Sequence, residues 1–268
     1  MSKTQRKGEA VVLLDKPFEL GDPFKVYFSD AEQPVLFDPT RMPPQDFRVR
    51  LARVIEQLGF TPKIYSAQQM LDEIQKRDAN LSFGINTGGG STVVYRMLEV
   101  IIDHVHKNGS TTRSYVPHFA GSGGAFTFMA TRHRNIGRKA QLALHAAVGD
   151  SGTIDCMDGI EEGVTVEQVV ARRTAFLRER LHTFLGNLGS EPHVVGLREK
   201  IIADVFDNPQ RSDYYFHFDI KLLQELHLAV VHYHLKTMAS AFQRTTGLDP
   251  EQFPEIKRLF LERPAQAE

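Results

Sequence analysis

The sequence contains one cysteine and no long run of apolar residues. Because Cys156 has no second cysteine to pair with, an internal disulfide is excluded, as is usual for proteins of a reducing compartment. The apolar run near the N-terminus is too short for the core of a secretory signal. No segment approaches the roughly 18 consecutive apolar residues of a membrane-spanning helix. The sequence therefore predicts a cytoplasmic protein that has no membrane as a partner.

Nucleotide-binding motifs are also missing. Neither of the two glycine clusters is followed by the lysine of a phosphate-binding loop. In "GSGGAF", Phe126 stands where a dinucleotide-binding loop has its third glycine. The 268-residue chain has a formal net charge of −1, which gives no electrostatic reason to expect nucleic acid. We therefore expect neither a nucleotide cofactor nor a nucleic-acid partner.

Thiol and metal sites have only weak candidates. Cys156 lies in the acidic segment "GTIDCMDGIEEG", and neighbouring carboxylates disfavour the reactive thiolate. Two pairs of histidines are spaced two residues apart, so on a helix the members of each pair point in different directions. This spacing favours histidines on a helix surface over a metal site. The pairs are His104 with His106 and His232 with His234.

The residues that are present describe a globular protein of alternating strands and helices. Apolar residues make up 41% of the chain and charged residues 24%, which is the composition of a globular protein. A length of 268 residues is enough for one large domain or two modest ones. We expect weak structure in the first 24 residues, and apolar periodicity predicts the elements that follow. The predicted strands are residues 24–29, 81–86, 114–119 and 139–146. The predicted helices are residues 46–59, 66–77, 92–109 and 125–133, then a long helix that opens with a capping box from Thr165 to Gln168, and further helices.

Two glycine turns join a strand to a helix, "TGGGS" at 87–91 and "AGSGG" at 120–124. A turn of this kind points backbone N–H groups outward at a helix N-terminus, where a phosphate or an oxyanion can bind. "AGSGG" is close to the G-x-S-x-G pattern that displays a nucleophilic serine. The N–H of Gly123 would then face the oxyanion, and "TGGG" would supply a second donor if the two turns lie side by side. Repeated strand–turn–helix units predict an α/β fold.

Four segments in this order resemble the ClpP peptidase subunits. "SFGINTGGGS" resembles their strand and I-N-S-P-G-G loop, and "FAGSGGAFTFMAT" resembles their active-serine segment. "RKAQLALHA" resembles the segment that ends in the catalytic histidine, and "RSDYYFHFDIKLLQELHL" resembles the one that carries the catalytic aspartate. The resemblance covers residues 81–146 well and 205–230 loosely.

The resemblance implies a catalytic triad and an oxyanion hole. Ser122 would be the nucleophile, His145 the general base and then acid, and Asp213 the group that orients the imidazole. The backbone N–H groups of Gly89 and Gly123 would bind the oxyanion. It further implies peptide or unfolded protein as substrate, a homo-oligomeric ring, a separate ATP-driven (AAA+) unfoldase and no cofactor.

The fold that the resemblance implies is a ClpP/crotonase-like superhelix, or spiral, of repeated ββα units in a single domain. This domain would span residues 25–237, with an N-terminal segment at 1–24 and a C-terminal extension at 238–268. The chain departs from the family at several positions. Gly88 replaces the proline of the first loop, Gly123 replaces a methionine, and Ala146 and Ala147 replace the glutamine and proline after the histidine.

Several alternatives remain open at this point. Asp204, Asp207 and Asp219 lie near Asp213 in the sequence and compete for its role. Crotonase-like acyl-CoA enzymes share the fold and its glycine turns, and an inactive ring-forming paralogue would keep both. An α/β-hydrolase would instead order its triad as serine, aspartate and histidine, which His227 or His232 would complete. A Ser/Lys dyad is disfavoured, because "VVARRTAFLRERL" contains arginine where the lysine is expected.

Overall fold

The structure is a computed structural model. It describes residues 7–18, 21–39, 64–146, 165–186, 192–207, 216–218, 220–226 and 228–261. The predicted helix at 46–59 lies outside the described residues, as does Cys156.

A mixed eight-stranded sheet forms the centre of the molecule, in the strand order β11-β8-β6-β5-β1-β2-β3-β4. Neighbouring strands from β1 through β5, β6 and β8 to β11 run parallel, whereas β2 is antiparallel to both β1 and β3. The strands are β1 (Glu9–Leu14), β2 (Phe24–Phe28), β3 (Val35–Phe37), β4 (Ile64–Tyr65), β5 (Asn80–Ile85), β6 (Thr112–Val116), β8 (His133–Gly137) and β11 (Val230–His232).

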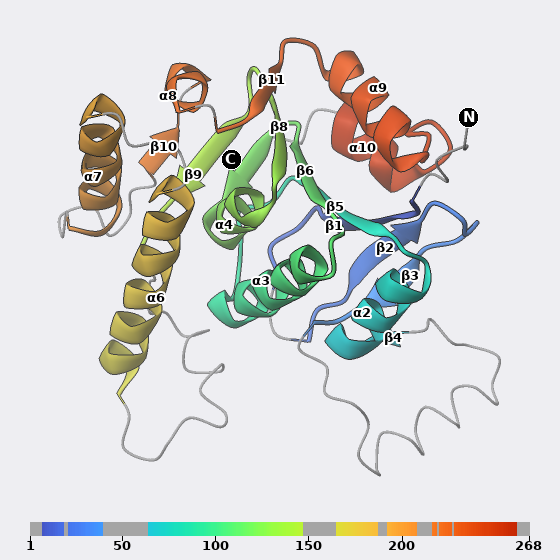
Figure 1. Ribbon diagram of the computed structural model, residues 1–268, viewed down its shortest axis with the longest axis horizontal. Helices are drawn as coiled ribbons and strands as arrows, with labels where there is room; N and C mark the ends of the chain where they lie inside the picture. Colours follow the sequence, from blue (N-terminus) through green and yellow to red (C-terminus); the bar gives the residue numbers. More distant parts are fainter. Residues whose placement is uncertain are drawn as a thin grey trace.

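Helices cover both faces of this sheet (Figure 1). On one face lie α2 (Ala67–Lys76), α3 (Thr92–Lys107) and α4 (Ser122–Ala130), and on the other lie α9 (Leu235–Thr246) and α10 (Pro254–Leu261). β1 is buried on both faces: Val12 and Leu14 pack in the first core, whereas Val11 and Leu13 pack in the second. A strand buried in this way reads as a continuous apolar run rather than an alternating one.

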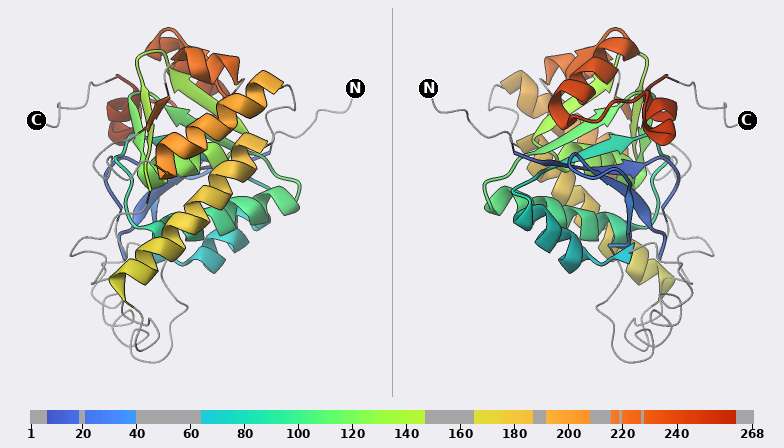
Figure 2. Two further views of the ribbon diagram at one scale, coloured as in Figure 1. Left: turned by 90° about the vertical axis from the view of Figure 1, so that its left-hand side faces the viewer. Right: turned by 90° about the vertical axis from the view of Figure 1, so that its right-hand side faces the viewer.

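A second sheet has three strands, in the order β10-β9-β7, and two of these strands lead directly into Ser122 and His145. β7 (Phe119–Gly121) pairs in parallel with β9 (Gln141–Leu144), and β9 pairs antiparallel with β10 (Phe216–Phe218). The remaining helices are α6 (Val166–Gly186), α7 (Pro192–Phe206) and α8 (Ile220–Glu225). Figure 2 shows α6 and α7 side by side across one flank of the molecule.

The predicted α/β class is confirmed, with a central sheet between helices, whereas the spiral of repeated units stays a prediction. The strands at 24–29, 81–86 and 139–146 form as β2, β5 and β9, and the helices at 66–77 and 92–109 form as α2 and α3. Both bonds of the Thr165–Gln168 capping box are present: Gln168 N–H donates to Thr165 Oγ1 over 3.3 Å, and Thr165 N–H donates to Gln168 Oε1 over 3.0 Å.

Three predictions about elements are wrong. The expectation of weak structure in the first 24 residues fails at β1, which lies in the sheet between β2 and β5. The single strand expected at 114–119 is divided between the two sheets at Pro117, which has no N–H to donate to a ladder. The helix expected at 125–133 begins earlier, at Ser122, and ends at Ala130, after which β8 begins.

The domain boundaries expected after residues 24 and 237 stay a prediction. The structure does show that the segments outside these boundaries pack on the same sheet. Of the C-terminal helices, α9 contributes Met238 and Phe242 to the second core and α10 contributes Leu259 and Phe260. Within the described ranges, no helix combines the length and the apolarity needed to cross a lipid bilayer.

Candidate active site

Ser122 and His145 follow two neighbouring strands directly. In the parallel pair of β7 and β9, Ala120 lies opposite Leu142 and Gly121 lies opposite Ala143. Ser122 comes directly after β7, and His145 directly after β9. Parallel strands end at the same edge of a sheet, so the structure brings both residues to one edge of the three-stranded sheet.

Ser122 has a strained backbone. Its φ of 48° lies in the left-handed region, which residues other than glycine rarely adopt. It is the first residue of α4, and its side chain is half-buried. Strain of this kind at a strand-to-helix turn is what exposes a nucleophilic serine in hydrolases. The structure therefore distinguishes Ser122 from an ordinary small residue in a turn.

The two glycine turns lie side by side, which is the condition under which "TGGG" could supply a second donor. Thr87 forms an isolated parallel bridge with Ala120, in which Gly121 N–H donates to the carbonyl of Thr87 over 2.8 Å. Gly89, with φ of 102°, packs directly on the serine turn. A Cβ at Gly89 would lie 2.5 Å from the Cβ of Ser122 and 2.8 Å from the N of Gly123. Only glycine fits at position 89, for reasons of both space and conformation.

The two expected oxyanion donors have different surroundings. The N–H of Gly123 belongs to the first turn of α4, where backbone N–H groups have no partner within the helix. The N–H of Gly89 donates to the hydroxyl of Thr87, over 3.1 Å between N and Oγ1. Sequence reasoning named both glycines but gave no role to Thr87.

Phe18 is a second residue that sequence reasoning missed. Its N–H donates to the carbonyl of Gly89 over 3.0 Å, and its own carbonyl accepts from the N–H of Ser91 over 2.8 Å. Its ring lies against the serine turn, because a Cβ at Gly123 would be 2.9 Å from the end of the ring. The segment after β1 therefore supports both glycine turns. No local pattern in the sequence marks this role, because the contacts join Phe18 to segments that lie far away in the sequence, at Gly89 and at Gly123.

His145 is half-buried, and its Nδ1 lies 2.5 Å from the carbonyl oxygen of Ala146. A carbonyl only accepts, so Nδ1 is the protonated nitrogen of the neutral ring and Nε2 is the unprotonated one. Burial lowers the pKa of His145 below its ordinary value of 6.5, and the hydrogen bond to Ala146 partly opposes that shift. The neutral imidazole, which is the form a general base needs, is therefore favoured.

Asp213 lies outside the described residues, as do Asp219 and His227. The strand that follows Asp213 is β10, whose first residue, Phe216, lies opposite Leu144. β10 therefore begins beside the end of β9 that leads into His145.

Two of the other candidate histidines, His232 and His106, have partners elsewhere in the fold. His232 lies on β11 in the large sheet, where its Nε2 is 3.0 Å from Oδ1 of Asn135. His106 Nε2 is 2.6 Å from Oγ1 of Thr112. Among the described residues, no group of three or more side chains of the types that bind metal ions is present.

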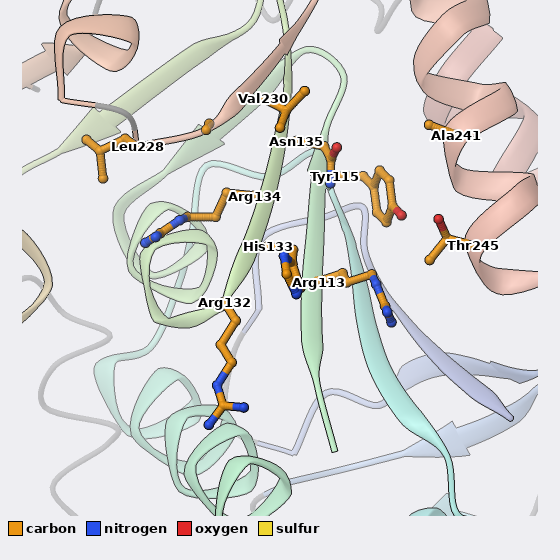
Figure 3. Close-up of a pocket in the computed structure, with 11 residues that line it drawn as sticks. Arg113, Tyr115, Arg132, His133, Arg134, Asn135, Leu228, Val230, Ala241 and Thr245 are labelled. Carbon is orange, nitrogen blue, oxygen red and sulfur yellow. The ribbon is translucent and has the colours of Figure 1, made fainter. Parts of the chain in front are cut away.

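A cleft of about 430 Å³ lies elsewhere, between β8, the approach to β11 and α9 (Figure 3). Three arginines, Arg113, Arg132 and Arg134, line it around His133, and burial followed by these charges lowers the pKa of His133. In Figure 3 the three guanidinium groups point away from one another, so they do not converge on one ligand. Neither Ser122 nor His145 lines this cleft, which is separate from the candidate active site.

Comparison with known proteins identifies no family for the chain. No family model matches the chain, and no curated protein matches it. Among solved structures, the chain is similar to a ClpP1 mutant from Listeria monocytogenes, with a TM-score of 0.47 and 11% sequence identity. The match covers 84% of this chain and 91% of that one. A likeness of this size does not assign the chain to a family.

Proposed function

We propose that the protein is a ClpP-like serine peptidase. One observation carries the proposal: Ser122 sits in a left-handed conformation at the end of one strand, and His145 follows the neighbouring strand. The buried contact of Gly89 with the serine turn supports it, because an oxyanion hole needs donors on both sides of the nucleophile. The ordered resemblance of four segments to ClpP subunits is a second, independent support.

The proposed reaction has two halves. Ser122 Oγ attacks the peptide carbonyl while His145 Nε2 accepts the hydroxyl proton, and the tetrahedral oxyanion accepts hydrogen bonds from Gly123 and Gly89. The C–N bond then breaks as His145 returns the proton to the leaving amine, which leaves an acyl ester on Ser122. Water, activated by His145, attacks the ester, and the acid product and the free hydroxyl form. Asp213 would favour the same tautomer that the Ala146 carbonyl selects.

A fluorophosphonate probe tests the nucleophile. We expect one covalent adduct on Ser122 in the wild-type protein, detected by intact mass and peptide mapping, and none in Ser122→Ala. His145→Ala should slow labelling strongly, whereas His227→Ala and His232→Ala should leave it near the wild-type rate. Circular dichroism of each variant establishes that it is folded. A folded wild-type protein that is not labelled, or is labelled only at other residues, contradicts the proposal.

Two further measurements address the rival functions and the assembly. Acyl-CoA binding that survives Ser122→Ala would favour the crotonase-like alternative. An unlabelled protein that still forms a ring would favour the inactive paralogue.

We propose a homo-oligomeric ring and a separate ATP-driven unfoldase as partners, because the ClpP resemblance implies both. Light scattering coupled to size exclusion should give a mass several times the 30.3 kDa of one chain.

A further inference from the structure

The hydroxyl of Thr87 connects the glycine turn to the segment after β1. It donates to the carbonyl oxygen of Lys16 over 2.7 Å, lies 3.4 Å from the carbonyl oxygen of Gly89 as a weaker acceptor, and accepts from the N–H of Gly89 over 3.1 Å. The residue is only 3% exposed, so water does not compete for these bonds. One side chain thus occupies the N–H that the proposed reaction assigns to the oxyanion.

The two donors of the proposed oxyanion hole are therefore unequal before a substrate binds. The N–H of Gly123 lies at the free N-terminus of α4, whereas the N–H of Gly89 is already bonded. Gly89 cannot shift toward α4 to escape, because its α-carbon already packs against Ser122 and Gly123. Release of its N–H requires that the bond to Thr87 lengthens or breaks.

We propose that Thr87 is a positioning residue that holds the Gly89 N–H in the resting protein and releases it only to a developing oxyanion. This inference rests on the proposed function. A charged oxygen is a stronger acceptor than a neutral hydroxyl, so it can displace Thr87, whereas the carbonyl oxygen of a bound substrate gains little by doing so. The second donor then acts mainly in the transition state. Its effect falls on kcat rather than on KM.

The test replaces the hydroxyl without changing the size of the side chain. Thr87→Val removes the bonds to Lys16 and to the Gly89 N–H together with the weaker contact to the Gly89 carbonyl, and the carbonyl of Lys16, an exposed residue, can turn to water. The backbone bonds between Phe18 and the glycine turn still hold the loop in place. With the Gly89 N–H released, kcat on an activated peptide ester and the rate constant of fluorophosphonate labelling should rise about three- to tenfold, with KM nearly unchanged. Thr87→Ser restores the hydroxyl and should return both values to those of the wild type.

Thr246 provides a matched control. It is 2% exposed, donates to the carbonyl of Phe242 over 2.9 Å and accepts from the N–H of Leu248 over 3.2 Å, all in the region of α9. Thr246→Val therefore removes the same two kinds of bond from a buried threonine away from Ser122. It should leave kcat and labelling at wild-type values, although it lowers thermal stability.

The possible outcomes separate this inference from the proposed function. A labelled wild type with a faster Thr87→Val and a normal Thr87→Ser supports both, whereas a folded wild type that is not labelled overturns both. If the wild type is labelled and a folded Thr87→Val is equal or slower, the role of Thr87 is overturned and the peptidase stands. A rise in Thr87→Ser or Thr246→Val also overturns it. If no variant is labelled, both the proposed function and this inference fail.

Discussion

Ser122 is one of two residues other than glycine with a positive φ among those described; the other is Asp78. A left-handed backbone costs a residue with a Cβ about 1–2 kcal/mol and costs glycine almost nothing. Ser122→Gly should therefore have a larger free energy of unfolding than Ser122→Ala, by about 1 kcal/mol. Urea denaturation of the two variants measures this difference, and neither should react with the probe.

Because Ser122→Gly and Ser122→Ala both lack the hydroxyl, a difference in their free energies of unfolding reports the backbone strain at position 122 and not the loss of the nucleophile. Asp78, the other left-handed residue, lies outside the site and gives a matched pair of variants. Asp78→Gly should also have a larger free energy of unfolding than Asp78→Ala. If glycine and alanine are equally stable at position 122, the serine is not held in the left-handed conformation. The main structural support for a nucleophile would then be lost.

His145 determines how the proposed activity depends on pH. Burial lowers its pKa below 6.5, so more than half of the folded protein keeps the neutral base at pH 6.5. The rate constant of labelling should therefore fall as the pH is lowered, with its acidic midpoint below about 6.5. A midpoint at or above 6.5, measured across a pH series, contradicts the buried geometry.

At the residue scale, the sequence could name residues of the candidate site wherever the signal is local. Ser122, Gly123 and Gly89 belong to short glycine-rich patterns, and His145 ends an alternating strand, so each could be named without a structure. Phe18 and Thr87 could not, because their roles arise from hydrogen bonds between the turn and the segment after β1. Such contacts depend on how strands pair, which no local pattern specifies.

Elements were predicted where the sequence is periodic. α3 shows a clear apolar stripe, and the sequence of β9 alternates large apolar residues with others although Leu142, Ala143 and Leu144 are all buried, so periodicity identified both. β1 is buried along its whole length and "EAVVLL" shows no alternation, which is why it was missed. β8 was missed for the opposite reason: His133, Arg134 and Asn135 are polar and partly or fully exposed.

One buried carboxylate attaches α6 to the helices behind the site. Glu99 on α3 is fully buried; it forms an ion pair with Arg180 of α6 and accepts from Arg96 over 2.6 Å and from Tyr95 over 3.2 Å. Burial, followed by the charge of Glu99, raises the pKa of Tyr95 well above its ordinary value. The ring of Tyr95 also contacts Phe176 of α6, with centroids 6.1 Å apart. The position of α6 therefore depends on a group that water cannot reach.

Glu99→Gln should lower the free energy of unfolding by about 2–4 kcal/mol, because it leaves the partly buried Arg180 without its counter-charge. Asp207→Asn is the control, since Asp207 also pairs with an arginine of α6, Arg178, but at the surface. Exposed pairs contribute little, so the control should unfold almost as the wild type does. If the free energy of unfolding falls equally in Glu99→Gln and Asp207→Asn, the burial of Glu99 does not contribute to its effect on stability. Urea denaturation of both proteins decides the point.

On the scale of the whole molecule, the first described strand belongs to the central sheet, and the last two described helices pack on that sheet. β1 lies between β2 and β5, and α9 and α10 cover one face of the strands. The ClpP resemblance implies a C-terminal extension at residues 238–268. If this extension were separate from the domain, the domain would fold without it. The packing argues otherwise. Tyr115 of β6 makes edge-on ring contacts with Phe242 of α9 and Phe260 of α10, with centroids 5.2 Å and 6.3 Å apart.

A chain truncated after His234 tests which view holds. Removal of α9 and α10 exposes Val11, Leu13, Tyr27 and Tyr115, which are all buried in the intact protein. At about 1.5–3 kcal/mol for each large apolar side chain, the loss is comparable to the whole stability of a typical domain. We expect the truncated chain to lose its cooperative thermal transition, whereas a chain that ends after Leu261 keeps both helices and should melt as the intact protein does. A cooperative transition in the shorter chain would make α9 and α10 a true extension, and the Ser122 site would then depend only on the strands before them.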